Sequence, residues 1–186
     1  MIRGLLAAIA LAGASASVQS LEPELDDTRA IYALNLFEAT CVSHMGDWDA
    51  ISAWVGLEQL PPIDKEMLAI LLQGKAGYGW NASGPNGDAL LILREDGACS
   101  VWARRAAAAQ VGIWVRKMME QPGGLSAELV EDREVDGRGG RYRLLAYRLS
   151  SPQSKRLFLF TSTLTESDGD EVIAQVILSV AEVAAP

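Results

Sequence analysis

Cysteine and histidine are scarce in this sequence, which has two cysteines and one histidine among 186 residues. A zinc site of the usual kinds takes most of its ligands from these two residue types, so any such site here would have to rely on carboxylates. The HExxH, CxxC and GxSxG signatures are also missing. The sequence therefore carries no assembled catalytic or metal-binding motif, and we predict no catalytic residue, no metal site and no cofactor.

Two stretches resemble ligand-binding loops but lack the required context. Residues 77–82 fit the loose dinucleotide pattern GxGxxA, yet they follow a predicted helix and lead into predicted strands, whereas such a loop must connect a strand to a helix. Asp132, Glu134 and Asp136 resemble the start of a calcium loop, but Arg143 stands where a bidentate glutamate is required. We therefore predict neither a nucleotide site nor a calcium site.

No apolar run approaches the roughly 20 residues that a membrane-spanning helix needs. The N-terminus instead has the three parts of a signal peptide: a positive residue at Arg3, an apolar run over residues 5–12, and the small-residue site Ala14-Ser15-Ala16. An uncleaved membrane anchor is the competing interpretation, which the short run disfavours. We predict a signal peptide at residues 1–16, a linker at residues 17–25 and a single domain at residues 26–186, with no stable membrane anchor and a periplasmic or secreted location.

Positive charge is in the minority. Cleavage of residues 1–16 from the 186 leaves 170 residues with 15 basic and 24 acidic side chains, a formal net charge of −9. Such a balance disfavours nucleic acid as a partner. Arg138, Arg141, Arg143 and Arg148 are close enough in sequence to form a basic stripe, but an ordinary solvated sheet face is the favoured interpretation.

The two cysteines, Cys41 and Cys99, are most simply interpreted as one disulfide in an oxidising compartment. It would tie a helical N-terminal part to a sheet. The alternative is a reactive thiol at Cys41 with His44 on the same helical face. Nothing nearby supplies the oriented base or oxyanion site that a cysteine nucleophile needs, so we favour the disulfide.

Helical patterns dominate the first part of the domain. Asp26 and Asp27 stand where an N-cap and a first-turn acid belong, a helix with an apolar stripe through Cys41 follows, and Gly46 ends it. Asp47 and Asp64 each stand where an N-cap belongs before a further helix. A fourth helix is predicted at residues 106–121.

The rest of the sequence consists mainly of β-type runs separated by turn residues, which is typical of antiparallel strands. Strands are predicted at residues 89–94, 98–103, 127–135, 141–149, 157–165 and 172–183, with a candidate short strand at residues 78–82. The last segment also has some helical character, so a C-terminal helix is kept as an alternative. The order ααα-ββ-α-ββββ predicts an α+β fold in which N-terminal helices pack on a mainly antiparallel sheet.

Five tryptophans could in principle supply a stacking platform for a ligand. Trp54 and Trp114 lie on predicted core stripes. Trp80 lies in a glycine-rich segment and is the one candidate for an exposed contact, although packing is the favoured interpretation for it too.

The helix bearing Cys41, the segment Gly77-Tyr78-Gly79-Trp80, and the hairpin from Leu90 to Val101 with a helix after it resemble a loose group of small exported proteobacterial proteins of unknown function. This resemblance covers about residues 30–120. It implies export and a disulfide, and it implies no catalytic residues.

Two classes of function are therefore carried forward. The first is a non-enzymatic exported module that binds a protein or a cell-envelope component through its sheet or through residues 77–88. The second is a small hydrolase or small-ligand-binding protein that uses a cleft not visible in the sequence.

Overall fold

The computed structural model describes residues 26–120, 125–137, 139–150, 156–167, 169 and 172–184. The predicted signal peptide and linker lie outside these residues, as does Arg138. The elements in chain order are α1 (Thr28–Phe37), the π-helical turn η1 (Glu38–Val42), α2 (Trp48–Glu58), α3 (Lys65–Leu72), β1 (Gly77–Asn81), β2 (Asp88–Arg94), β3 (Cys99–Arg104), α4 (Ala108–Glu120), β4 (Ser126–Gly137), β5 (Gly140–Ser150), β6 (Leu157–Leu164) and β7 (Val176–Val183).

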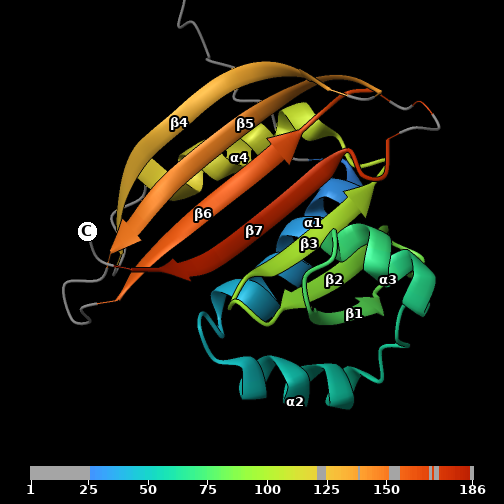
Figure 1. The fold of residues 1–186 in the computed structure, drawn as a ribbon. Helices are drawn as coiled ribbons and strands as arrows, with labels where there is room; N and C mark the ends of the chain where they lie inside the picture. The colour runs from blue at the N-terminus through green and yellow to red at the C-terminus, as the bar shows by residue number, and fades with distance from the viewer. Residues whose placement is uncertain are drawn as a thin grey trace, which may run out of the picture.

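The strands form one seven-stranded sheet in the order β1-β2-β3-β7-β6-β5-β4, and every neighbouring pair is antiparallel. The last strand thus lies in the middle, between the hairpin β2-β3 and the meander β4-β5-β6 (Figure 1). The predicted α+β class and the antiparallel sheet are confirmed. The candidate strand near residue 78 is present as β1, and the C-terminal segment is a strand rather than a helix.

The two faces of the sheet are covered unequally. Helices α1 and α4 lie behind the sheet in Figure 1, and the main core is enclosed between them and the strands. Phe37 of α1 and Phe160 of β6 meet edge to face in this core, with ring centroids 5.7 Å apart. On the opposite face, α3 packs a small cluster of Leu71, Leu72 and Ile92 over the β1-β2 end of the sheet. Figure 1 shows no described helix in front of β5, β6 and β7.

Three aspartates cap the N-termini of α1, α2 and α3, because each side chain accepts a hydrogen bond from a backbone N–H of the first turn. Asp27 accepts from Arg29, Asp47 from Ala50, and Asp64 from both Glu66 and Met67. The N-cap of α1 is therefore Asp27 rather than Asp26. The helical stripe through Cys41 is also less regular than predicted, since the α-helix gives way to the wider turn η1 after Phe37.

Both edges of the sheet are protected. At the β1 edge, the backbone N–H of Ile63 donates to the carbonyl of Gly79 (2.9 Å) and that of Asn81 donates to the carbonyl of Pro61 (2.8 Å). The β4 edge has a bulge between Leu129 and Glu131. Its exposed charged residues are Glu128, Asp132, Arg133, Glu134 and Asp136. Bulges and charges of this kind discourage another strand from pairing with an edge.

None of the described helices is long and apolar enough to cross a lipid bilayer.

Candidate functional site

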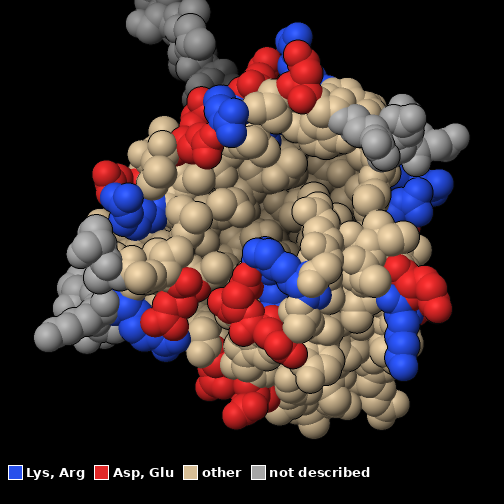
Figure 2. Space-filling model, viewed as in Figure 1, with Lys and Arg blue, Asp and Glu red and all other residues tan. Residues whose placement is uncertain are grey.

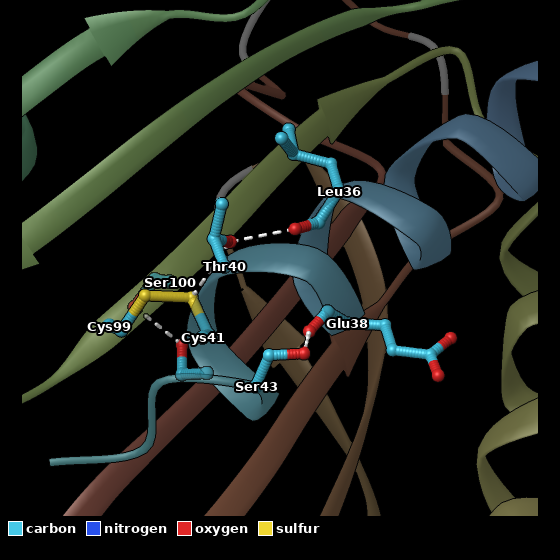
Figure 3. Close-up of a disulfide and its surroundings, with 8 residues drawn as sticks. Leu36, Glu38, Thr40, Cys41, Ser43, Cys99 and Ser100 are labelled. Atoms are coloured by element: carbon cyan, nitrogen blue, oxygen red, sulfur yellow. Dashed lines mark hydrogen bonds between the residues drawn. A yellow bond between two sulfur atoms is a disulfide. The ribbon is translucent and has the colours of Figure 1, made fainter. Parts of the chain in front are cut away.

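Cys41 and Cys99 form a disulfide that joins η1 to β3 across the core, with their Cα atoms 5.4 Å apart (Figure 3). Both residues are almost completely buried. The hydroxyl of Thr40 donates to the carbonyl of Leu36, and that of Ser43 donates to the carbonyl of Glu38. Both hydrogen bonds lie at the π-helical turn η1. Because the sulfur of Cys41 is bonded and enclosed, the structure gives no support to a reactive thiol beside His44.

Trp80 lies on β1, where it is half-buried and packs against the main core. Its indole stacks on the ring of Tyr78 (centroids 6.2 Å apart), and Trp48 of α2 meets Tyr78 edge to face. Tyr78 is the exposed member of this group, with 55% of its surface accessible. Any contact made by the glycine-rich segment would therefore depend on Tyr78 more than on Trp80.

The arginines of β5 do not form a single stripe. Strand alternation places Arg141 and Arg143 on the face that carries α4, and Arg148 on the opposite face. Arg143 makes two hydrogen bonds to Asp132 (2.9 and 2.8 Å), which hold the pKa of that carboxyl below its usual value despite the opposing effect of burial. Arg148 pairs with Glu128 (2.8 Å). These side chains mostly neutralise the acidic edge strand β4.

The outward face of β5, β6 and β7 is a surface with binding potential, and we call it the open sheet face. Its residues are Leu144, Ala146, Leu157, Leu159, Thr161, Thr163, Ile177, Ser179, Ala181 and Val183. Apart from buried Ala146, these residues are half-buried, and none carries a charge. The charged residue that β5 places on the same face is Arg148, which is exposed and pairs with Glu128. Figure 2, viewed from this side, shows an uncharged, hollowed surface over these strands with charged atoms around its margin.

A recess of about 250 Å³ continues this surface beneath α3, and we call it the α3 recess. The lining residues are Leu71, Leu72, Gln73, Lys75, Ile92, Arg94, Ser100, Trp102 and Ser179. The hydroxyl of Ser179 donates to that of Ser100 (2.8 Å). Arg94 and Lys75 both pair with Asp96 at the mouth of the recess. The recess thus offers an apolar floor with two hydroxyl groups and a polar rim.

A second cavity, of about 360 Å³, lies on the other side of the sheet between α4 and strands β4 to β6. We call it the α4 cleft. It is lined by Ala108, Ala109, Gly112, Arg116, Glu134, Arg141, Arg143, Leu164, Thr165 and Glu166. A more polar pocket of about 540 Å³ surrounds the start of α4, where the carboxylates of Asp27 and Glu166 accept hydrogen bonds from Ala107 and Ala109.

None of these three cavities assembles recognisable catalytic chemistry from the residues that line it. Within the described ranges, no group of three or more His, Cys, Asp or Glu side chains is gathered so that it could hold a metal ion. The buried hydroxyl of Ser162 has no hydrogen-bond partner there, so it has no base of the kind that activates a serine nucleophile.

The sequence named the sheet only in general terms as a binding surface, without locating the open sheet face, and it gave no indication of the α4 cleft. A signal for the first was present in residues 157–164, because Phe158 and Phe160 alternate with Leu157 and Leu159 and so make both faces of the strand apolar. A strand with only one buried face should alternate apolar and polar residues. Comparisons with protein-family models, with curated proteins and with solved structures found no match to this chain.

Proposed function

We propose that this chain is an exported, non-enzymatic binding module that receives a protein partner of the cell envelope on its open sheet face. The observation that carries the proposal is the unequal cover of the sheet: helices enclose one face, whereas the apolar strands β5 to β7 have no described cover on the other. Contiguous apolar surface that is rimmed by charge is typical of interaction sites.

The chemistry of this face favours a polypeptide that presents apolar side chains. Leucine, isoleucine and valine side chains supply the contact area, and Thr161, Thr163 and Ser179 supply hydroxyl groups that can hydrogen-bond to polar groups of the partner. The α3 recess at the margin has room for one inserted side chain beside Trp102. A pocket of this kind is where an anchoring residue of a partner contributes most to affinity.

The disulfide supports an oxidising location. Cytosolic thiols are generally kept reduced, so a buried structural disulfide is typical of periplasmic or secreted proteins. The proposal therefore keeps the predicted cleavage after Ala16. Mass spectrometry of the protein recovered from the periplasm or medium should give a chain that begins at Ser17, and recovery of the unprocessed chain from the cytosol would contradict export.

The docking proposal is tested by a photo-activated cross-linking residue at Thr161, in the centre of the open sheet face, with the full chain expressed in cells. The matched control carries the same residue at Glu38, which is exposed on η1 on the helical side. We expect a discrete adduct from position 161 and none from position 38. Adding Leu159→Lys should remove the adduct, because it places a charge on the apolar contact.

Equal labelling at both positions, or no adduct at position 161, would contradict the docking proposal. An adduct with twice the mass of the chain would show that a second copy occupies the face, and would overturn the proposal of a different protein as partner.

The competing idea of a hydrolase receives no support from the bonded Cys41. A small-ligand site has one observation in its favour, which is the α4 cleft.

A further inference from the structure

The α4 cleft exists because α4 presents small residues to the sheet along its first half. Ala108, Ala109 and Gly112 face β6 where larger side chains would fill the space. A Cβ atom added at Gly112 would lie 3.0 Å from Cδ1 of Leu164, so the helix approaches β6 closely at this point. The cleft opens from there towards β5 and β4, and its floor is apolar.

Charged groups line the walls of the cleft, and most of them already have partners. Arg143 is held by Asp132, and Arg141 lies near Glu134 (3.4 Å) and Asp136 (3.7 Å). The carboxylate of Glu166 accepts a hydrogen bond from the backbone N–H of Ala109 at the start of α4 (2.5 Å). These contacts leave little unused charge at the mouth of the cleft.

Arg116 differs from the other two arginines. It extends from the third turn of α4, and its Nε atom is buried without a hydrogen-bond partner among the described residues. A buried donor without a partner costs stability and needs an explanation. Arg116 as a whole is half-buried and lines the cleft. Because a guanidinium matches a carboxylate in shape and charge, the part of this side chain that faces the cleft can pair with an acid bound there.

We propose that the α4 cleft binds a small monocarboxylic acid with an apolar body, whose carboxylate pairs with Arg116 and whose body lies on Ala108, Ala109 and Leu164. The volume of about 360 Å³ is at the lower end of the range for small-molecule sites. The lining has three arginines and two glutamates. Asp132 and Asp136 pair with Arg143 and Arg141 at the same walls, so no net positive charge remains, and the single guanidinium of Arg116 with an unsatisfied donor suits a monoanion better than a dianion such as phosphate. The site is separate from the open sheet face and goes beyond the proposed function.

The experiment is calorimetric titration of the exported protein with hexanoate, 1-hexanol and inorganic phosphate. We expect saturable binding of hexanoate, binding of hexanol weaker by about tenfold or more, and no competition by phosphate, because a charged hydrogen bond separates the acid from the alcohol. Arg116→Gln should weaken hexanoate binding by about tenfold or more. Arg133→Gln is the matched control, since Arg133 lies on the opposite face and pairs with Glu131.

A second variant keeps the test valid if Arg116→Gln does not fold. Ala109 is exposed at the rim of the cleft, so Ala109→Leu should fill the cleft without disturbing the core and should reduce hexanoate binding by about tenfold. The proposal would be overturned by the absence of saturable hexanoate binding up to about 20 mM, by tighter binding of phosphate than hexanoate, or by equal losses of binding in Arg133→Gln and the cleft variants.

Discussion

Asp27 and Gln110 cap each other's helices. The Oδ2 atom of Asp27, at the start of α1, accepts a hydrogen bond from the backbone N–H of Ala107 just before α4 (2.7 Å). In return, Oε1 of Gln110 in α4 accepts hydrogen bonds from the backbone N–H groups of Asp26 (3.1 Å) and Asp27 (3.2 Å). The first turns of two helices about 80 residues apart in sequence are thus fixed to one another.

Removing this shared cap should destabilise the fold more than removing a cap of one helix. Asp27→Ala removes acceptors at the starts of both α1 and α4, and we expect a loss of about 2 kcal/mol in the free energy of unfolding. Asp27→Asn keeps one oxygen acceptor and should cost about 1 kcal/mol. Urea denaturation measures both, and Asp47→Ala, which affects α2 alone, should cost less than Asp27→Ala.

A double variant tests whether the cap is shared. Because Asp27 and Gln110 are coupled, the losses from Asp27→Ala and Gln110→Ala should be less than additive when the two changes are combined. Strict additivity would contradict the reciprocal cap.

The same aspartate should make stability depend on pH. Burial raises the pKa of Asp27, but hydrogen bonds from the backbone of Arg29 and Ala107 and the nearby Arg29 guanidinium together hold that pKa below its usual value. Since the folded-state pKa is lower than the unfolded one, this stabilisation is present above about pH 5 and is lost as the pH falls through the folded pKa. Denaturation curves between pH 2 and 6 should therefore converge for the wild type and Asp27→Asn at low pH. A constant difference between the two proteins across this range would contradict the prediction.

The caps and the helices were predictable because their signals are local. Asp47 and Asp64 each stand just before an apolar pattern of helical period, and the structure uses both as N-caps. The disulfide was predictable for a different reason, since two cysteines allow only one intramolecular pair. The position of β7 had no local signal. Branched aliphatic residues predicted a strand at residues 172–183, with a helix kept as the alternative, but nothing in that segment specifies β3 and β6 as the neighbours.

The α4 cleft could not be predicted from the sequence for the same physical reason. Arg116 belongs to a helix and Arg143 to a strand, and only the packing of α4 on β4 to β6 brings them to one cavity. The three arginines of β5 looked like a stripe because they are near in sequence, whereas strand alternation sends Arg148 to the other face. The structure therefore agrees with the favoured interpretation of these arginines as an ordinary solvated sheet face rather than a stripe.

The disulfide should contribute strongly to stability. Cys41 and Cys99 are separated by 58 residues, and the chain-entropy treatment gives about 4 kcal/mol for closing a loop of that size. Cys41→Ala combined with Cys99→Ala should lower the free energy of unfolding by about this amount. Reductant should destabilise the wild type and leave the double variant unchanged. The prediction fails if fully reduced wild type, checked by mass, denatures at the same urea concentration as the oxidised protein.

Two helices end in a backbone conformation that suits glycine better than the residue present. Gln59 after α2 and Gln73 after α3 have φ values of 53° and 52°, in the left-handed region that is costly for residues with a Cβ atom. Gln59→Gly should raise the free energy of unfolding by about 0.5 to 1 kcal/mol. The matched control is Ser52→Gly at an exposed position inside α2, which should instead lower stability by about 0.5 kcal/mol. Thermal or urea denaturation of the two variants checks the opposite signs.

The guarded edges of the sheet limit how this protein can assemble. An exposed strand edge can template further strands end to end and so start a fibril. Here Pro61 and Ile63 form backbone hydrogen bonds with the outer edge of β1. The bulge and the exposed charges of β4 disfavour pairing with another strand at the opposite edge. Growth by strand addition is blocked in both directions, so even a highly concentrated solution of this chain should resist polymerisation into cross-β fibres.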